Sequence, residues 1–230
     1  MATDESRRRV IQLGESPDNV WVTGAPSLDD VEGARQSVRA HALTALGLSL
    51  QSRFAIVLFH PVVQERGDAY AQTRALAEAV NSTLVSRGMD VIWLDPNADA
   101  GSAAILEAAH EAAGSAVRFV PHLPRPVFLQ ALRHSDILVG NSSAGIIEAA
   151  SLGTPVVNIG TRQRFRERNI NTLDCQADAQ SIEAAIVQSM QHGRFQETNR
   201  YGDGAAGARI VELLATQPIA ADLLDKVNAY

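Results

Sequence analysis

The sequence predicts an α/β protein built on a Rossmann-like parallel sheet with helices on both faces. Residues 54–59 (FAIVLF) are apolar throughout, as expected for a strand that is buried on both sides. Residues 137–160 (ILVGNSSAGIIEAASLGTPVVNIG) form a strand–turn–helix–strand unit, and two strands joined through a helix lie parallel. Similar apolar runs alternate with helical segments over most of the 230 residues, which is the pattern of a doubly wound fold.

The composition limits the class of protein. The net charge of −6 disfavours a nucleic-acid-binding surface, which would be basic. The 46% of hydrophobic residues suffices for a packed core, but no apolar run approaches the ~20 residues of a membrane span. The polar N-terminus, MATDESRRRV, lacks the apolar region of a secretory signal, and the single Cys175 excludes an internal disulfide or a thiolate metal cluster. We therefore expect a cytoplasmic protein that binds neither nucleic acid nor membrane.

The first 52 residues carry weaker structural signals than the rest. A helical turn is expected over residues 7–14 and a short strand over 20–24, although neither has an apolar partner nearby. Residues 25–30 (APSLDD) form a turn and a helix start, and the helix is expected over 31–46. Residues 47–52 are expected to be a linker.

From residue 53 onward, strands and helices alternate. The strands are short apolar runs, whereas the helices are longer and carry apolar stripes such as Leu76, Val80 and Leu84. Gly153 ends the helix of the central unit, because a left-handed C-cap costs glycine little. The strands are expected at 54–59, 91–94, 117–120, 137–139 and 156–159, with a weak candidate at Leu173, and the helices at 70–86, 102–113, 126–133, 144–152, 179–192 and 207–216.

The turn after residues 137–139 is the best candidate for a phosphate site. Ser142 and Ser143 stand at a helix N-cap, where free backbone N–H groups and the helix dipole favour an anion. Arg162 follows the next strand, in a segment (160–168) with four arginines, and its guanidinium suits a diphosphate; the other three are expected to be solvated. Alternatively, the serines only cap the helix and all four arginines face solvent. We favour the phosphate site because both features follow the carboxyl ends of adjacent strands, where ligands bind in open α/β sheets.

Three further polar residues are candidates for ligand contacts. Glu148 lies on a helix that is apolar nearly all round, where an unpaired carboxylate is costly. It either binds ribose hydroxyls, faces the surface, or pairs with an arginine such as Arg162. His60 directly follows the first buried strand, and it either caps that strand, donates to a diphosphate or protonates a leaving phosphate. Asn97 lies in the turn after VIWL and either shapes that turn or reaches the ligand.

Residues 139–163 (VGNSSAGIIEAASLGTPVVNIGTRQ) closely resemble part of the C-terminal nucleotide-binding domain of the hydrolysing UDP-N-acetylglucosamine 2-epimerases. Three other stretches agree in the same order: residues 59–62 (FHPV), 96–102 (PNADAGS) and 201–204 (YGDG). Members of this family make N-acetylmannosamine for sialic-acid-type sugars. Four matching segments spread over most of the chain make the resemblance specific.

The resemblance implies a GT-B-like, two-domain architecture of which this chain is one half. Residues 1–25 are then a remnant of the N-terminal domain, and 26–52 are a linker helix and crossover. Residues 53–204 are the nucleotide-sugar-binding Rossmann-like domain, and 205–230 are a C-terminal cross-domain helix and tail. Most of the N-terminal domain is expected to be missing from the chain.

The resemblance also implies roles for individual residues. His60 stands in the motif that carries a ligand-contacting histidine, and the Pro61 after it favours the hydrolysing branch, as does the absence of acids from residues 160–163 (GTRQ). In the family, the loop before residue 126 holds the uracil, often with an aromatic side chain after a proline. Here that place is Arg125, whose guanidinium can stack on a base but leaves the choice between UDP and GDP open. Residues 201–204 either line the cleft or only form a turn.

The family reaction eliminates UDP and then adds water with inversion at C2, without a metal or a redox cofactor. The carboxylates that take the C2 proton belong mostly to the N-terminal domain. Three functions therefore remain open: half of a 2-epimerase, a non-catalytic nucleotide-sugar-binding module, or the donor half of a GT-B glycosyltransferase, which the motifs disfavour. The expected partners are UDP or a UDP-amino sugar, together with a second copy of the chain or a chain that supplies the missing domain.

Overall fold

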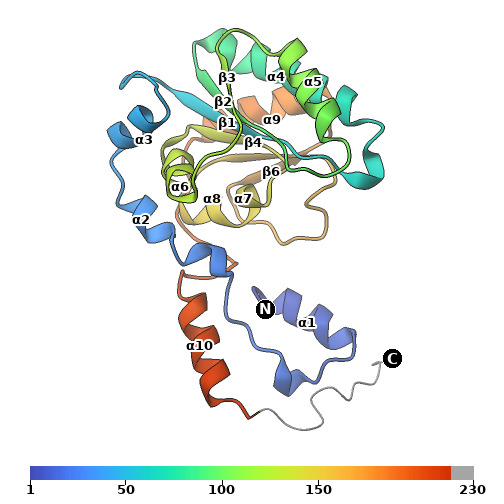
Figure 1. The fold of residues 1–230 in the computed structure, drawn as a ribbon, viewed down its shortest axis with the longest axis vertical. Helices are drawn as coiled ribbons and strands as arrows, with labels where there is room; N and C mark the ends of the chain where they lie inside the picture. Colours follow the sequence, from blue (N-terminus) through green and yellow to red (C-terminus); the bar gives the residue numbers. More distant parts are fainter. Residues whose placement is uncertain (219–230) are drawn as a thin grey trace.

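The computed structural model describes residues 1–218, and a six-stranded parallel sheet forms its centre (Figure 1). The strand order is β3-β2-β1-β4-β5-β6. The strands are β1 Phe54–Leu58, β2 Asp90–Leu94, β3 Val117–Val120, β4 Ile137–Gly140, β5 Val156–Ile159 and β6 Thr172–Cys175. The predicted Rossmann-like sheet is confirmed, including the weak candidate at Leu173, which lies in β6.

Helices cover both faces of this sheet. The helices of the described residues are α1 Asp4–Gln12, α2 Val31–Arg35, α3 Arg39–Ala45, α4 Ala69–Thr83, α5 Ser102–Ala112, α6 Arg125–His134, α7 Ser143–Ile146, α8 Glu148–Ser151, α9 Ala179–His192 and α10 Ala206–Thr216, with 3₁₀ turns at Pro17–Asn19, Pro26–Leu28, Val63–Glu65 and Val85–Arg87. Helices α4, α5 and α9 pack on one face, against side chains such as Val57 and Trp93. Helices α2, α3, α6, α7 and α8 pack on the other face, against Phe54 and Ile56 (Figure 1). This division follows from the alternation of side chains along each strand.

Two helices that the sequence predicts as continuous are broken. The helix expected over residues 31–46 is α2 and α3, separated at Val38, which is extended with φ −91° and ψ 132°. The helix expected over 144–152 is α7 and α8, separated at Ile147. At this second break, the side-chain amide of Asn169 donates to the Ile146 carbonyl at 3.0 Å and that of Asn199 donates to the Ile147 carbonyl at 2.6 Å. Side chains distant in sequence thus take up the carbonyls that an unbroken helix would have used.

The strand predicted over residues 20–24 is wrong. Within the described part of the chain no strand lies beside this segment, and its backbone bonds instead to the chain start. The Met1 ammonium donates to the Trp21 carbonyl at 2.6 Å, and the Thr23 N–H donates to the Met1 carbonyl at 2.9 Å. An apolar run becomes a strand only where another strand satisfies its backbone groups.

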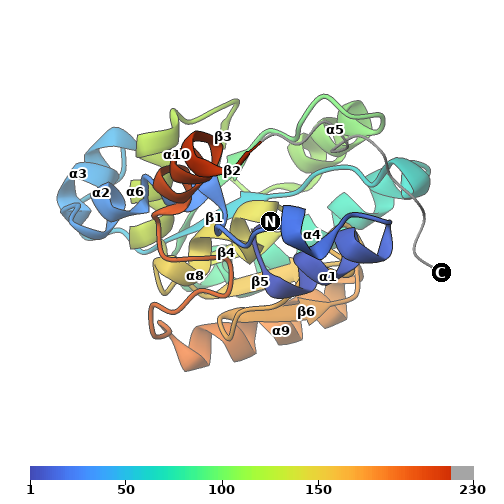
Figure 2. The same ribbon diagram turned by 90° about the horizontal axis from the view of Figure 1, so that it is seen from below.

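Helix α10 and the segment around α1 lie beside each other at one end of the molecule (Figures 1 and 2). An apolar cavity of about 540 Å³ lies between them, and Trp21 and Leu213 are among its lining residues. Asp29 fixes the start of α10, because its carboxylate accepts the N–H groups of Ala206 at 2.9 Å and Gly207 at 2.6 Å. Residues 219–230 of the predicted tail lie outside the described residues.

Across residues 1–218, none of the helices combines the length and the apolar character that crossing a membrane requires.

Candidate functional site

The candidate site lies where the strand order changes direction. The chain places β2 and β3 on one side of β1, and β4, β5 and β6 on the other. The crossovers therefore diverge between β1 and β4, and ligands of open α/β sheets bind beyond the carboxyl ends of strands at this position. His60 follows β1 and Asn141 follows β4, so both lie at this point.

His60 is held in one tautomer. Its Nδ1 accepts the backbone N–H of Asn97 at 3.0 Å, so the ring proton is on Nε2. Burial, and secondly the charge of Arg162, lower the pKa of His60 to about 4, although Asp99 opposes this shift. At neutral pH the imidazole is therefore uncharged and has one N–H to donate.

Asn97 contributes its backbone to this arrangement. Its side-chain amide nitrogen donates to Asp99 at 2.5 Å, while its Oδ1 is buried without a hydrogen-bond partner. The sequence leaves open whether Asn97 shapes the turn or contacts a ligand. The structure gives it the first role, through the N–H that fixes His60, and its direct contact with a nucleotide stays a prediction.

The serine turn has the expected N-cap. Ser142 precedes α7, and its hydroxyl oxygen accepts the N–H of Ala144 at 3.3 Å. Ser143 is the first residue of α7, and its hydroxyl forms no side-chain hydrogen bond within the described residues. Because α7 has only four residues, its dipole is small, and an anion at this turn needs a side-chain charge as well.

Arg162 can supply that charge. Its Nη1 donates to the Asn141 carbonyl at 3.1 Å, which places the guanidinium beside the serine turn. In the described part of the chain it has no carboxylate within ion-pair distance, so its other N–H groups remain free for a ligand. Arg168 differs, because it binds Asp174 at 2.9 Å and 3.0 Å and is only partly exposed. Arg168 is therefore paired and partly exposed, whereas Arg164 and Arg166 are exposed as predicted.

Glu148 is buried and paired, but with a different arginine from the one expected. Its side chain is 9% exposed, and its Oε1 accepts a hydrogen bond from Nη1 of Arg125 at 3.4 Å. Its Oε2 is buried without a hydrogen-bond partner. Burial raises the pKa of Glu148. The backbone of Glu148 itself and the charge of Arg125 oppose this shift. One carboxylate oxygen is thus held and the other is unsatisfied.

Arg125 is tied to the segment before α2, at Ser27 and Asp30. Its guanidinium binds both carboxylate oxygens of Asp30, at 2.7 Å and 2.9 Å, and also donates to the Ser27 carbonyl. Together with Glu148 these acceptors engage the N–H groups of the guanidinium, whereas a base would stack on its face. The predicted stacking of a base on Arg125 stays a prediction.

The YGDG segment forms a turn that packs on Gly24 and Ala25. The Tyr201 carbonyl accepts the N–H of Ala25 at 2.7 Å, and Asp203 pairs with Arg209 at 2.6 Å and 2.7 Å. Gly202 has φ +128°, and a Cβ there would lie 3.1 Å from the Cα of Gly24. Only glycine fits this approach, so the turn is explained without a ligand.

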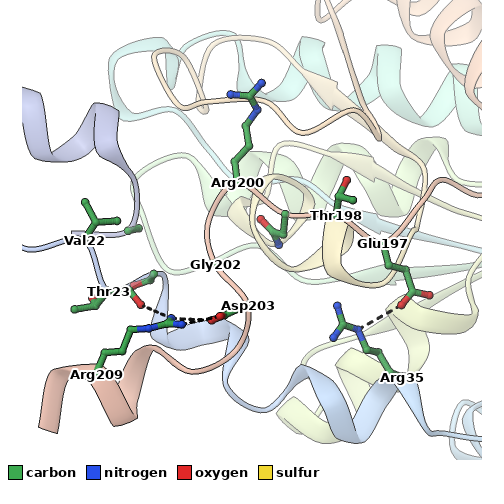
Figure 3. A pocket seen from close by; sticks show the side chains of 12 residues that line it. Val22, Thr23, Arg35, Glu197, Thr198, Arg200, Gly202, Asp203 and Arg209 are labelled. Carbon is green, nitrogen blue, oxygen red and sulfur yellow. Dashed lines mark hydrogen bonds and ion pairs between the residues drawn. The ribbon is translucent and has the colours of Figure 1, made fainter. Parts of the chain in front are cut away.

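A polar cavity of about 530 Å³ opens beside this turn (Figure 3). Arg35, Arg200 and Arg209 line it together with Glu197 and Asp203. Four of these charged groups are paired with one another, as the Arg35–Glu197 and Arg209–Asp203 contacts in Figure 3 show, whereas Arg200 contacts Glu167 outside the cavity. None of its lining residues is among those at the strand ends, so this cavity is separate from the candidate site.

The sequence does not single out two buried residues of the site. Asn141 is 1% exposed and Gln163 is 2% exposed, and the side-chain amide of Gln163 donates to the Asn141 carbonyl at 2.8 Å. Both stand inside the motif at 139–163, next to residues that are predicted to bind phosphate. In the sequence, their amide side chains close to the ends of β4 and β5 are the signal that they hold the site together.

Comparison with known proteins identifies the family. A sequence profile described as UDP-N-acetylglucosamine 2-epimerase matches residues 1–215. The chain is 35% identical over 231 residues to the UDP-N,N'-diacetylbacillosamine 2-epimerase (hydrolyzing) of Legionella pneumophila, a match that covers 100% of this chain and 60% of that protein. It is 28% identical over 204 residues to the UDP-N-acetylglucosamine 2-epimerase of Neisseria meningitidis, covering 89% of this chain and 53% of that one.

Solved structures show the same fold. The crystal structure of UDP-GlcNAc 2-epimerase from Neisseria meningitidis bound to UDP-GlcNAc matches with a TM-score of 0.72 at 16% identity, over 94% of this chain and 60% of that one. The chain thus spans somewhat more than half the length of the relatives it matches. Because the profile covers nearly all of the described residues, the chain belongs to the UDP-N-acetylglucosamine 2-epimerase family.

Proposed function

We propose that this chain is the nucleotide-sugar-binding part of a hydrolysing 2-epimerase that acts on a UDP-linked 2-acetamido sugar. The observation that carries the proposal is the group of donors at the ends of β1, β4 and β5. The Nε2–H of neutral His60, the hydroxyls of Ser142 and Ser143 and the unpaired guanidinium of Arg162 lie around one switch point. Such donors suit a diphosphate.

Each part of the ligand then has a binding group. The diphosphate binds to the serine turn and Arg162, and the ribose hydroxyls donate to the unsatisfied Oε2 of Glu148. The base lies against the loop that contains Arg125. The elimination breaks the bond between C1 of the sugar and the diphosphate oxygen, and a proton leaves C2. Water then adds across the double bond, so that the products are UDP and the 2-epimeric sugar.

His60 acts in this scheme as a hydrogen-bond donor to the leaving diphosphate. Because its pKa lies near 4 in the free protein, the ring is not a cationic acid at neutral pH. A bound diphosphate would raise this pKa, since a nearby negative charge favours the imidazolium. The catalytic contribution of His60 is therefore stabilisation of the charge that develops on the departing UDP.

The base that takes the C2 proton lies outside the described residues. Near His60 the carboxylates are Asp99, which accepts from Asn97, and Glu65, which accepts from Thr161 and Gln72. Both are engaged in turn contacts. The chain alone is therefore expected to bind UDP without turning over the UDP-sugar. This same observation favours the second candidate, a nucleotide-sugar-binding module without activity of its own.

The sugar is either N-acetylglucosamine or N,N'-diacetylbacillosamine, the two sugars in the names of the relatives above. In the first case the product is N-acetylmannosamine, which sialic-acid-type synthesis consumes. We place this activity in the cytoplasm, in keeping with a chain whose lone Cys175 forms no disulfide.

Calorimetric titration of the purified chain with UDP, GDP and uridine tests the proposal. UDP should bind at least tenfold more tightly than uridine, because uridine has no diphosphate to reach the serine turn and Arg162. A chain that binds none of these ligands, or that binds uridine as tightly as UDP, would refute the diphosphate site. A sensitive assay for released UDP, with each UDP-sugar in turn, separates binding from catalysis. Sustained turnover by the isolated chain would show that the C2 base lies within it.

A further inference from the structure

Asn141 is a buried residue that connects three strand ends. It directly follows β4, it is 1% exposed, and its own backbone N–H donates to the Leu58 carbonyl at 3.1 Å. Its side chain and its carbonyl then make four further hydrogen bonds, none of which is to a neighbour in sequence. Asn141 therefore contacts both the end of β1 and the segment after β5.

The side-chain amide of Asn141 brackets the backbone of His60. Its Oδ1 accepts the His60 N–H at 2.7 Å, and its Nδ2 donates to the His60 carbonyl at 2.8 Å. Pairing between β1 and β4 ends at Leu58 and Gly140. The amide therefore satisfies the two backbone groups that β4 would have paired if it continued, and it fixes the peptide from which the imidazole projects.

The approach that allows this bracket depends on Gly140. Its φ is +143°, and a Cβ at this position would lie 2.1 Å from the Leu58 carbonyl oxygen. Any other residue would push β4 away from β1. The glycine thus lets the following asparagine reach across to His60.

The carbonyl of Asn141 holds the other side of the site. It accepts hydrogen bonds from Nη1 of Arg162 at 3.1 Å and from the amide of Gln163 at 2.8 Å. The next residue in the chain is Ser142, the N-cap of α7. One residue therefore sets the relative positions of the imidazole, the guanidinium and the serine turn.

We propose that Asn141 is the positioning residue of the diphosphate site, which it assembles by fixing His60 and Arg162 on either side of the serine turn. The proposal rests on the function proposed above, since it names what organises that same site. It implies that the site is already assembled in the ligand-free chain. It also implies that loss of the Asn141 amide disorganises His60 although the ligand never touches Asn141.

Asn141→Leu removes both side-chain bonds and keeps a similar volume. Asn171→Leu is the matched control, because Asn171 is also buried, at 2% exposure, and its Nδ2 donates to a backbone carbonyl, that of Thr154, at 2.7 Å. Asn171 precedes β6, at the opposite ends of the strands from the site. Asn141→Leu loses two side-chain hydrogen bonds and Asn171→Leu loses one, so both variants are expected to lower the melting temperature.

The first measurement needs no ligand. A ¹H–¹⁵N correlation spectrum of the histidine rings, with the His60 signals assigned from their loss in His60→Gln, reports the tautomer. Wild type and Asn171→Leu should show His60 protonated at Nε2 alone, whereas Asn141→Leu should show a mixture of tautomers. An unchanged His60 pattern in folded Asn141→Leu, or the same change in Asn171→Leu, would overturn the proposal.

The second measurement is calorimetry with UDP and uridine on the same samples. Asn141→Leu should bind UDP at least tenfold more weakly than wild type and uridine equally well, and Asn171→Leu should match wild type with both. Equal weakening in the two variants would overturn the proposal. If wild type itself does not bind UDP, the proposed function fails, and the ring spectrum still decides the role of Asn141. Should Asn141→Leu not fold, Asn141→Ser takes its place with the same expected results, because its shorter side chain cannot bridge both His60 groups.

Discussion

The backbone N–H of Asn97 donates to Nδ1 of His60 at 3.0 Å, and this hydrogen bond cannot form when Nδ1 is protonated. Protonation of His60 therefore breaks a contact between the ends of β1 and β2. Burial and Arg162 disfavour the charged ring further, and the pKa of His60 falls to about 4. The stability of the fold and the state of the candidate site are thus linked through one imidazole.

This linkage predicts a loss of stability in acid. The pKa of His60 is about 4 in the folded chain and about 6.5 when unfolded, so the unfolded chain binds more protons between these values. The contribution to the free energy of unfolding is complete above pH 6.5 and is lost as the pH falls toward 4. Between pH 7 and pH 4, wild type should lose up to about 3 kcal/mol more than His60→Gln in urea unfolding. His134, whose pKa burial also lowers, is present in both proteins and cancels. Equal losses would contradict the assignment.

Arg162→Ala should weaken UDP binding by about ten- to a hundred-fold. The variant removes a charge-assisted contact with the ligand that is worth roughly 1.5–3 kcal/mol. It breaks no ion pair within the described residues, because Arg162 has no carboxylate within ion-pair distance there. Arg164→Ala is the control, because Arg164 carries the same charge in the same loop but is exposed and lies over the Phe165 ring. Calorimetry of both variants with UDP decides the matter. A weakening that is the same in both would reflect the charge of the loop and not a contact made by Arg162.

Glu148→Gln should weaken the binding of UDP and leave that of pyrophosphate unchanged, because only UDP carries a ribose. Glutamine keeps an acceptor for Arg125 but replaces one carboxylate oxygen with a donor, which no longer accepts from a ribose hydroxyl. Glu167→Gln, a change of the same charge on a residue that contacts Arg200, serves as the control. If UDP and pyrophosphate weaken equally in Glu148→Gln, the carboxylate supports the serine turn and does not bind the ribose.

The apolar surface of α10 predicts self-association. Val211 is 67% exposed and Leu214 is 80% exposed, and the cavity between α10 and the α1 segment is lined largely by apolar side chains. A helix with one unpartnered apolar face gains free energy by burying it. Sedimentation velocity should show concentration-dependent association of wild type and a marked reduction in Leu214→Lys. Leu50→Lys, which changes an exposed leucine in the linker, should leave it unchanged. A monomeric wild-type chain at high concentration would rule this surface out.

The sheet could be predicted from the sequence because its strands are short, apolar and separated by clear helical segments. β1, β2, β4 and β5 all have buried residues on both faces, so their sequences are largely apolar, apart from Asp90 at the start of β2 and the buried Asn158 in β5. The segment at 20–24 has the same local character and is not a strand. This wrong prediction shows that strand formation depends on whether another strand lies alongside, and a local sequence pattern does not contain that information.

The parts of the site that could not be predicted are the long-range contacts of polar side chains. The residue types at the strand ends point to a phosphate site, and the structure does bring His60, the serine turn and Arg162 to adjacent strand ends. The partner of Glu148 is Arg125, which lies 23 residues away on another helix, and the sequence gives no way to prefer it to Arg162. The break at Ile147 depends on Asn199, which is 52 residues away. Such contacts are set by the fold and not by spacing.

Asp29 and Asp30 are consecutive residues with different tasks. Asp29 holds the first N–H groups of α10, and Asp30 holds Arg125, which in turn reaches Glu148. Because these two residues are adjacent in the chain, the anchor of α10 and the partner of Arg125 lie on the same short segment. A displacement of α10 that moved this segment would therefore also move the partner of Arg125, and with it the contact between Arg125 and Glu148.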